Sequence, residues 1–143
     1  MNRLILLIAA TLVTSSCTVV RKLKDPSTLP ADGKANRTRA EKALDDSSAI
    51  PIAAKPEIVW SVLTDAKTFP TWNDTVLKLE GTIAKDQTIA LVSKVAPDRT
   101  FNLKVSEFDA PKRMVWEDGN SMFIGVRHFT LTEKDGANRA GDE

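Results

Sequence analysis

Between residues 77 and 132, apolar side chains recur at every second position in five segments, and this alternation constrains the fold more than any other feature of the sequence. The pattern begins at Leu77 and Leu79 and returns in four later segments, which contain Ile89, Leu91, Val95, Phe101, Leu103, Val105, Met114, Trp116, Phe129 and Leu131. A period of two places successive side chains on opposite faces of a strand. Turn-forming residues such as Asp118-Gly119-Asn120 separate the segments. We therefore predict an antiparallel meander with one apolar face.

One strand and one helix are predicted ahead of the meander. Residues 48–54 form the strand, and Pro51 indicates an edge position because proline cannot donate to the ladder. Pro56 and Glu57 are typical of a first helical turn. Helical spacing then gives one apolar stripe: Val59, Val62, Leu63 and Ala66. Phe69-Pro70 ends the helix, so the fold class is α+β.

The N-terminus has the pattern of an export signal. Arg3 is followed by an apolar run over residues 4–13, which is too short to cross a hydrocarbon core of ~30 Å. Cys17 follows small residues, and its position resembles the lipidation motif of bacterial lipoproteins, although Thr14 stands where leucine is usual. Acylation at Cys17 would give a membrane-anchored lipoprotein that faces the periplasm. The alternative is ordinary cleavage near Ser16, which would give a soluble secreted or periplasmic protein with a free thiol.

Four regions follow from these patterns. We predict a signal peptide over residues 1–16, a flexible tether over 17–47, a folded domain over 48–136 and a disordered tail over 137–143. The tether contains prolines and polar residues, lacks aromatic residues and shows no sustained periodicity.

Composition excludes several classes of function. The formal net charge is +1, which argues against a nucleic-acid partner. A single cysteine and a single histidine exclude a disulfide framework and a Cys/His zinc site. The sequence has no glycine-rich phosphate loop. We therefore predict no metal and no cofactor.

Four stretches carry a resemblance to a known superfamily. Residues 52–60, 63–65, 69–73 and 127–131 read IAAKPEIVW, LTD, FPTWN and RHFTL. In this order and spacing they resemble the START-like superfamily, also called SRPBCC, and within it the polyketide cyclase/dehydrase-like branch. The resemblance implies a helix-grip fold, in which a curved antiparallel sheet wraps around a long C-terminal helix. It also implies an apolar ligand cavity, closed at one end by two short helices.

After Gly136 the superfamily continues with one more strand and a long helix, whereas residues 137–143 are polar and carry no such pattern. Three interpretations stay open: a shortened gene product, a short variant completed by a partner chain or bound lipid, and a fragment. Without that helix, one inward row of apolar residues would be poorly covered: Phe101, Leu103, Trp116, Phe129 and Leu131. Poor cover of this inward row predicts low stability of the isolated domain and self-association.

The predicted cavity residues are mostly the apolar residues of the resemblance and of the inward row. They are Trp60, Leu63, Phe69, Trp72, Phe101, Leu103, Trp116, Arg127, Phe129 and Leu131. Arg127 is two residues before Phe129 and is therefore predicted to lie on the same face of the strand. Its guanidinium could hold a carboxylate or phosphate at the cavity mouth. The alternative for Arg127 is a salt bridge to an acidic residue of a neighbouring strand, namely Glu80, Glu117 or Asp118. His128 has the opposite parity and is predicted to lie on the surface.

Two main classes of function are compatible with these residues. Binding of a hydrophobic small molecule or lipid needs only an apolar cavity with a polar anchor. A cyclase, aromatase or dehydratase needs an acid or base in the cavity, for which Arg127, Asp65, Glu80 and Glu117 are the candidates. A third alternative is a non-catalytic interaction module or a non-functional product. We predict the binding function, with no residue assigned to catalysis.

Overall fold

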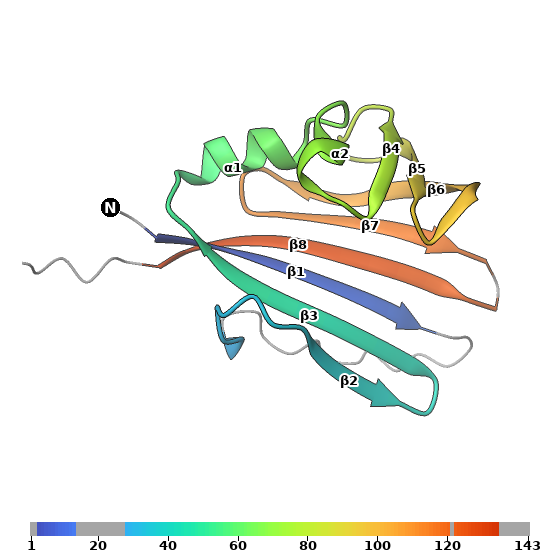
Figure 1. Cartoon of the computed structure of the whole chain (residues 1–143), viewed down its shortest axis with the longest axis horizontal. Helices are drawn as coiled ribbons and strands as arrows, with labels where there is room; N and C mark the ends of the chain where they lie inside the picture. The colour runs from blue at the N-terminus through green and yellow to red at the C-terminus, as the bar shows by residue number, and fades with distance from the viewer. Residues whose placement is uncertain (1–2, 14–27, 121, 135–143) are drawn as a thin grey trace, which may run out of the picture.

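The computed structural model describes residues 3–13, 28–120 and 122–134, which form one antiparallel sheet and two short helices (Figure 1). The sheet order is β2-β3-β1-β8-β7-β6-β5-β4. The elements along the chain are β1 (Arg3–Val13), β2 (Asn36–Ala40), β3 (Ala43–Ile52), α1 (Pro56–Leu63), α2 (Phe69–Trp72), β4 (Val76–Glu80), β5 (Thr88–Ser93), β6 (Ala96–Asp109), β7 (Arg113–Gly119) and β8 (Ile124–Lys134).

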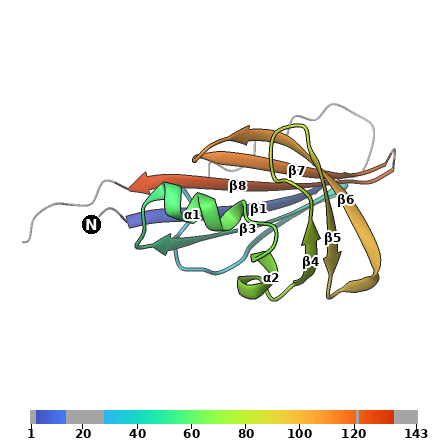
Figure 2. The ribbon, with the colours of Figure 1, turned by 90° about the horizontal axis from the view of Figure 1, so that it is seen from above.

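The meander predicted from the alternating pattern is confirmed as strands β4 to β8. Each strand pairs antiparallel with the next one along the chain. Figure 2 shows that the sheet curves strongly, with β4 to β6 bent toward the two helices. The α+β class, with a curved antiparallel sheet and two short helices after a strand, is therefore confirmed.

Helix α1 begins at the predicted proline but buries a different set of residues than the predicted stripe. Val59 and Leu63 are buried as expected, whereas Val62 is 44% exposed. Trp60, which is not part of that stripe, is buried and packs edge-on against Phe108 with ring centroids 5.3 Å apart. A helix of eight residues makes only about two turns. The side of α1 that faces the sheet is the one that carries Val59, Trp60 and Leu63.

A β-bulge changes the face of one predicted inward residue in β4. The pairing of β4 with β5 shifts register between Val76 and Lys78. Val76 and Leu79 are buried, whereas Leu77 is 46% exposed. A bulge inserts one extra residue and so reverses the parity of the side chains that follow it. The simple alternation of Leu77 with Leu79 therefore does not hold.

The sheet also begins earlier than predicted. Strand β2 and the first part of β3 lie within residues 17–47, where a flexible tether was expected. The hairpin is held by antiparallel pairing and by a bidentate contact of Arg37 with Asp46, whose N···O distances are 2.7 and 2.8 Å. Polar strands of this kind carry little hydrophobic pattern, so the sequence alone did not distinguish them from a linker.

Strand β3 is an interior strand over its first half, whereas Pro51 had indicated an edge. β3 pairs with β2 only from Ala43 to Ser47, and with β1 on its other side up to Ile52. Pro51 lies beyond the end of β2, which pairs with β3 only up to Ser47. The missing N–H of the proline therefore costs no bond with β2.

The apolar segment near the N-terminus forms β1, which lies between β3 and β8. The backbone of this strand is in antiparallel register with both neighbours. Export of the chain and acylation of Cys17 stay predictions. Cys17 and the predicted tail over residues 137–143 lie outside the described residues.

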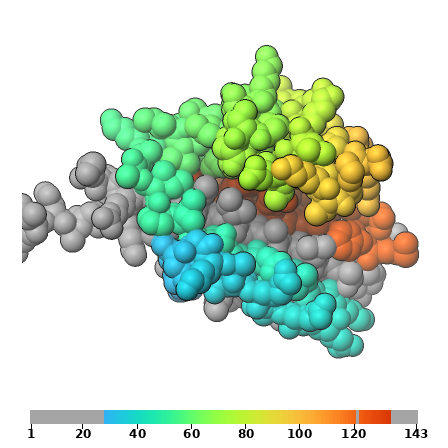
Figure 3. All heavy atoms as spheres, in the orientation of Figure 1, coloured from blue at the N-terminus to red at the C-terminus, as the bar shows by residue number. Residues whose placement is uncertain are grey.

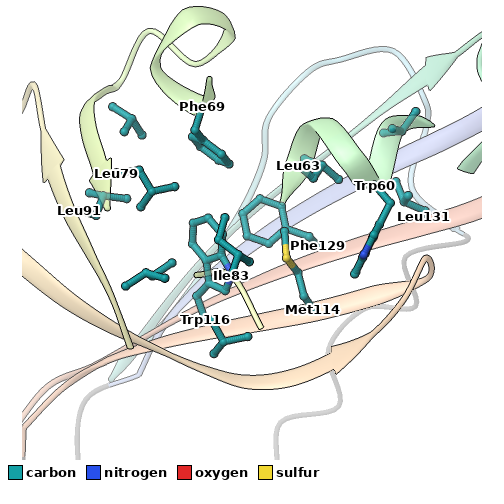
Figure 4. Packing of buried hydrophobic residues seen from close by; sticks show 14 residues of the cluster. Trp60, Leu63, Phe69, Leu79, Ile83, Leu91, Met114, Trp116, Phe129 and Leu131 are labelled. Atoms are coloured by element: carbon teal, nitrogen blue, oxygen red, sulfur yellow. The ribbon is translucent and has the colours of Figure 1, made fainter. Parts of the chain in front are cut away.

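The core lies between the concave face of the sheet and the two helices, and Figure 4 shows Leu63 and Phe69 above Trp116, Met114 and Phe129. The prediction that the inward row would be poorly covered is wrong for its largest members. Trp116, Phe129 and Leu131 are buried, and Phe101 and Leu103 pack against the same cluster. Curvature of the sheet lets α1, α2 and the β4–β5 hairpin cover these residues.

Candidate functional site

Six of the predicted cavity residues meet in one cluster. They are Trp60, Leu63, Phe69, Trp116, Phe129 and Leu131, and all of them are buried. The ring of Trp116 lies 4.7 Å from Phe129 and 5.6 Å from Phe69 between centroids. These residues come from α1, α2, β7 and β8, so the two helices and the sheet together build an aromatic interior.

Three further predicted residues lie at the periphery of that cluster. Phe101 and Leu103 are partly buried. The Arg99 guanidinium carbon lies 4.4 Å from the centroid of Phe101, in a cation–π contact. Trp72 is 39% exposed, although its ring lies 4.2 Å from that of Phe69. Trp72 therefore belongs to the rim of the aromatic cluster and not to its centre.

Arg127 is a cationic residue on the face that carries this cluster. It lies on β8 directly opposite Trp116 of β7, two residues before Phe129. Burial lowers the pKa of Arg127, because a charged group is disfavoured where water is excluded. The predicted salt bridge to Glu80, Glu117 or Asp118 is not formed in the described part of the chain.

The indole N–H of Trp116 adds a second donor on the same face. Trp116 is 1% exposed, and its Nε1 has no hydrogen-bond partner in residues 28–120 and 122–134. A buried donor without a partner costs about 1–3 kcal/mol. Trp116 and Arg127 are direct cross-strand neighbours. Trp116 thus offers one buried donor without a partner beside the half-buried cation of Arg127. With the apolar wall next to them, the two groups form a suitable environment for one anionic group of an apolar molecule.

The described pocket lies apart from the aromatic cluster. Figure 3 shows the atoms of β2 and β3 on one side of this face and those of the helices with β4 on the other. A separate pocket of about 380 Å³ lies where α1 begins and β8 ends. Its walls come from Pro56, Glu57, Pro111, Lys112, Leu131, Thr132 and Glu133. Only Leu131 among the predicted residues lines that pocket, so it is distinct from the predicted cavity.

The carboxylates that were candidates for acid–base chemistry lie away from the cluster. Asp65 is exposed and accepts a bond from the Lys67 N–H at 3.1 Å. Glu80 is exposed and pairs with Lys78, with an N···O distance of 2.9 Å. Glu117 is exposed and accepts from the Ser106 hydroxyl at 2.8 Å. None of these three groups faces the aromatic interior.

Comparison with protein families gives one match, and it covers most of the folded region. The model of a family described as "Polyketide cyclase / dehydrase and lipid transport" matches residues 43–140. The chain belongs to this family. Comparisons with curated proteins and with solved structures give no match. The family match begins at the first residue of β3, so β1 and β2 lie outside it.

The face of the family domain opposite the aromatic cluster carries a polar group that the sequence patterns did not reveal. His128, predicted to be a surface residue, is half-buried, and its Nδ1 lies 3.3 Å from Nη2 of Arg113. Arg113 Nε lies 2.9 Å from the Glu107 carboxylate, although its N–H is not aimed at that oxygen. The three residues come from β6, β7 and β8, so only strand register brings them together.

Burial is the main cause that lowers the pKa of His128, and the positive charge of Arg113 adds to it. The carboxylates of Glu107, Asp45 and Glu117 act in the opposite direction. No signal in the sequence beyond strand parity could have located this group.

Within the described residues, no cluster of metal-ligating side chains is found. No helix there is long and apolar enough to cross a membrane.

Proposed function

We propose that this domain binds an apolar molecule that carries one anionic group, such as the carboxylate of a fatty acid. The aromatic interior supplies the apolar contact, and Arg127 with the Trp116 indole N–H supplies the polar anchor. The family description includes lipid transport together with cyclase and dehydrase activity. Binding is the proposal that the disposition of charged groups on this chain supports best.

The observation that carries this proposal is the burial of Arg127 without an ion-pair partner. Arg127 is half-buried on the apolar face, burial lowers its pKa, and it makes no ion pair with any described residue. A partly desolvated cation without a counterion is destabilising. An anionic ligand would neutralise that charge, and its apolar part would then lie beside Phe129 and Trp116.

The enzyme alternative has less support from the arrangement of side chains. Catalysis of cyclisation or dehydration needs a general acid or base within reach of the bound molecule. The three candidate carboxylates are exposed and already engaged with other groups. His128 lies on the opposite face of the sheet, because it is one residue away from the inward-facing Phe129.

The place of action remains a proposal that rests on the sequence. Export followed by acylation of Cys17 would hold the domain at a membrane surface, where a lipid-like ligand is at hand. Identification of a diacylated Cys17 by mass spectrometry of the protein from a bacterial envelope would establish this location. Recovery of the protein with an unmodified Cys17 would contradict it.

Binding can be tested with a fluorescent fatty acid, cis-parinaric acid, and its uncharged methyl ester. We expect the acid to bind the delipidated protein more tightly than the ester does. Arg127→Gln should weaken binding of the acid by roughly 10-fold or more, because a hydrogen bond to a charged group is worth about 1.5–3 kcal/mol. Binding of the ester should change little, since the ester carries no charge for Arg127 to neutralise.

Arg39→Gln provides the matched control, because Arg39 is an exposed arginine on β2. It should leave binding of both probes unchanged. Equal affinity of wild type and Arg127→Gln for the acid would contradict the proposed anchor. Turnover of an aromatic polyketide substrate, without retention of either probe, would favour the enzyme alternative.

A further inference from the structure

Strand β1 joins the β2–β3 hairpin to the meander β4 to β8. β3 and β8 do not pair with each other, and both pair with β1. Residues 4–13 are in continuous register with β3, and residues 3–13 with β8. Without β1, the β2–β3 hairpin would be separated from the meander β4 to β8, and each part would expose an unpaired strand edge. Figure 1 shows β1 between these two strands along their length.

The sequence of β1 suits an interior strand. Between Arg3 and Val13 it has no charged residue and no proline, and apolar residues occupy both parities. Such a continuous apolar run is typical of a strand that has neighbours on both edges and little contact with water. Its register partners on β8 include Phe129 and Leu131, which belong to the aromatic core.

β1 also lies outside the residues that the family model matches. The family match begins at residue 43, so the strand that joins β3 to β8 in the described sheet comes from outside the matched range. The distance in sequence between β1 and β8 exceeds a hundred residues, so their pairing is a tertiary contact and not a local hairpin.

We propose that β3 and β8 together form a binding site for one extended apolar strand, which residues 3–13 fill in this structure. We call this site the β3–β8 acceptor. Its recognition chemistry is that of an unpaired sheet edge on each side, which binds an extended apolar segment through main-chain hydrogen bonds. Residues 3–13 therefore have two mutually exclusive uses. In the acceptor they complete the sheet, and in the export machinery they must be free of it.

The register of β1 can be tested by disulfide formation in the full chain. The chain would carry Cys17→Ser and be made by cell-free translation without membranes, so that the N-terminus is retained. Leu7→Cys and Thr130→Cys introduce cysteines at paired Cα positions. Directly opposed residues in antiparallel strands have Cα atoms about 4.5–5.5 Å apart, which a disulfide can bridge. We expect this pair to oxidise readily to an intramolecular disulfide.

Two control pairs sharpen the result. Leu7→Cys with Val126→Cys uses the same face of β8 but lies four residues, or about 13 Å, out of register; we expect several-fold less disulfide. Val115→Cys with His128→Cys joins β7 to β8 and should oxidise as readily as the first pair. A Leu7/Thr130 pair that stays reduced, or a Leu7/Val126 pair that oxidises equally well, would overturn the proposal.

Discussion

The neighbours of His128 depend on how the strands pair and not on its position in the sequence alone. Strand parity predicted its face, because it alternates with Phe129 along β8. Parity did not predict its partners, since Arg113 and Glu107 belong to other strands. The proximity of these groups depends on the register of β6, β7 and β8. The same limit applies to the Trp116–Arg127 pair, which lies on the opposite face.

The lowered pKa of His128 predicts how stability depends on pH. The unfolded chain titrates near pH 6.5 at this residue, and the folded chain at a lower pH. Below about pH 6.5 the unfolded state binds more protons, so the free energy of unfolding should rise as pH increases toward 6.5 and then level off. Urea unfolding between pH 5 and pH 8 measures this slope.

His128→Gln is the variant that isolates this contribution. It should flatten the pH dependence in the acid part of the range, because glutamine does not titrate. The charged groups around the histidine are Arg113, Glu107, Asp45 and Glu117, and all of them remain in the variant. Identical slopes in wild type and variant would show that another group causes the pH dependence.

Phe69 is expected to be a main source of stability at the residue scale. It is fully buried, and its ring lies between those of Trp72 and Trp116. Phe69→Ala should reduce the free energy of unfolding by about 3–5 kcal/mol, because it removes a large side chain from the packed core. Trp72→Ala should reduce the free energy of unfolding clearly less, since Trp72 lies on the rim of the aromatic cluster. Urea denaturation of both variants measures the difference, and equal losses would contradict this ranking.

At the scale of elements, the turn between β7 and β8 depends on one glycine. Gly119 has φ of +146°, and an added Cβ would lie 2.2 Å from the Phe123 carbonyl oxygen. Gly119→Ala should therefore force the turn apart and lower the melting temperature. Gly125→Ala is the matched control, because its added Cβ would have only ordinary contacts, the nearest at 3.8 Å. A Gly119→Ala chain with unchanged stability would mean that the turn adjusts freely.

The elements themselves were predictable to different degrees. Strong alternation predicted β5 to β8, and Pro56 with Glu57 predicted the start of α1. The bulge in β4 was not predictable, because it depends on the pairing with β5. Strand β2 was missed because its polar residues resemble a linker, and only the pairing with β3 shows it to be a strand.

At the scale of the whole molecule, the proposed β3–β8 acceptor predicts that its strand can be supplied by a separate peptide. In the full chain, Ile8→Pro removes a backbone donor from the middle of β1 and should lower the melting temperature. A synthetic peptide with the sequence of residues 3–13 should raise the melting temperature of this variant in a saturable way. The same peptide with proline at position 8 is the control and should have no effect. Equal effects of the two peptides would indicate non-specific binding.

The sequence by itself determined the α+β class, the antiparallel meander, the start of the first helix and the apolar residues of the core, because these follow from local periodicity and backbone preference. The tertiary structure decided which residues become neighbours. It placed Arg127 beside Trp116, grouped His128 with Arg113, and put residues 3–13 between β3 and β8. A largely apolar run of ten residues suits an export signal and an interior strand equally well. Its pairing as a strand depends on the edges of β3 and β8, and those edges come from parts of the chain that are distant in sequence.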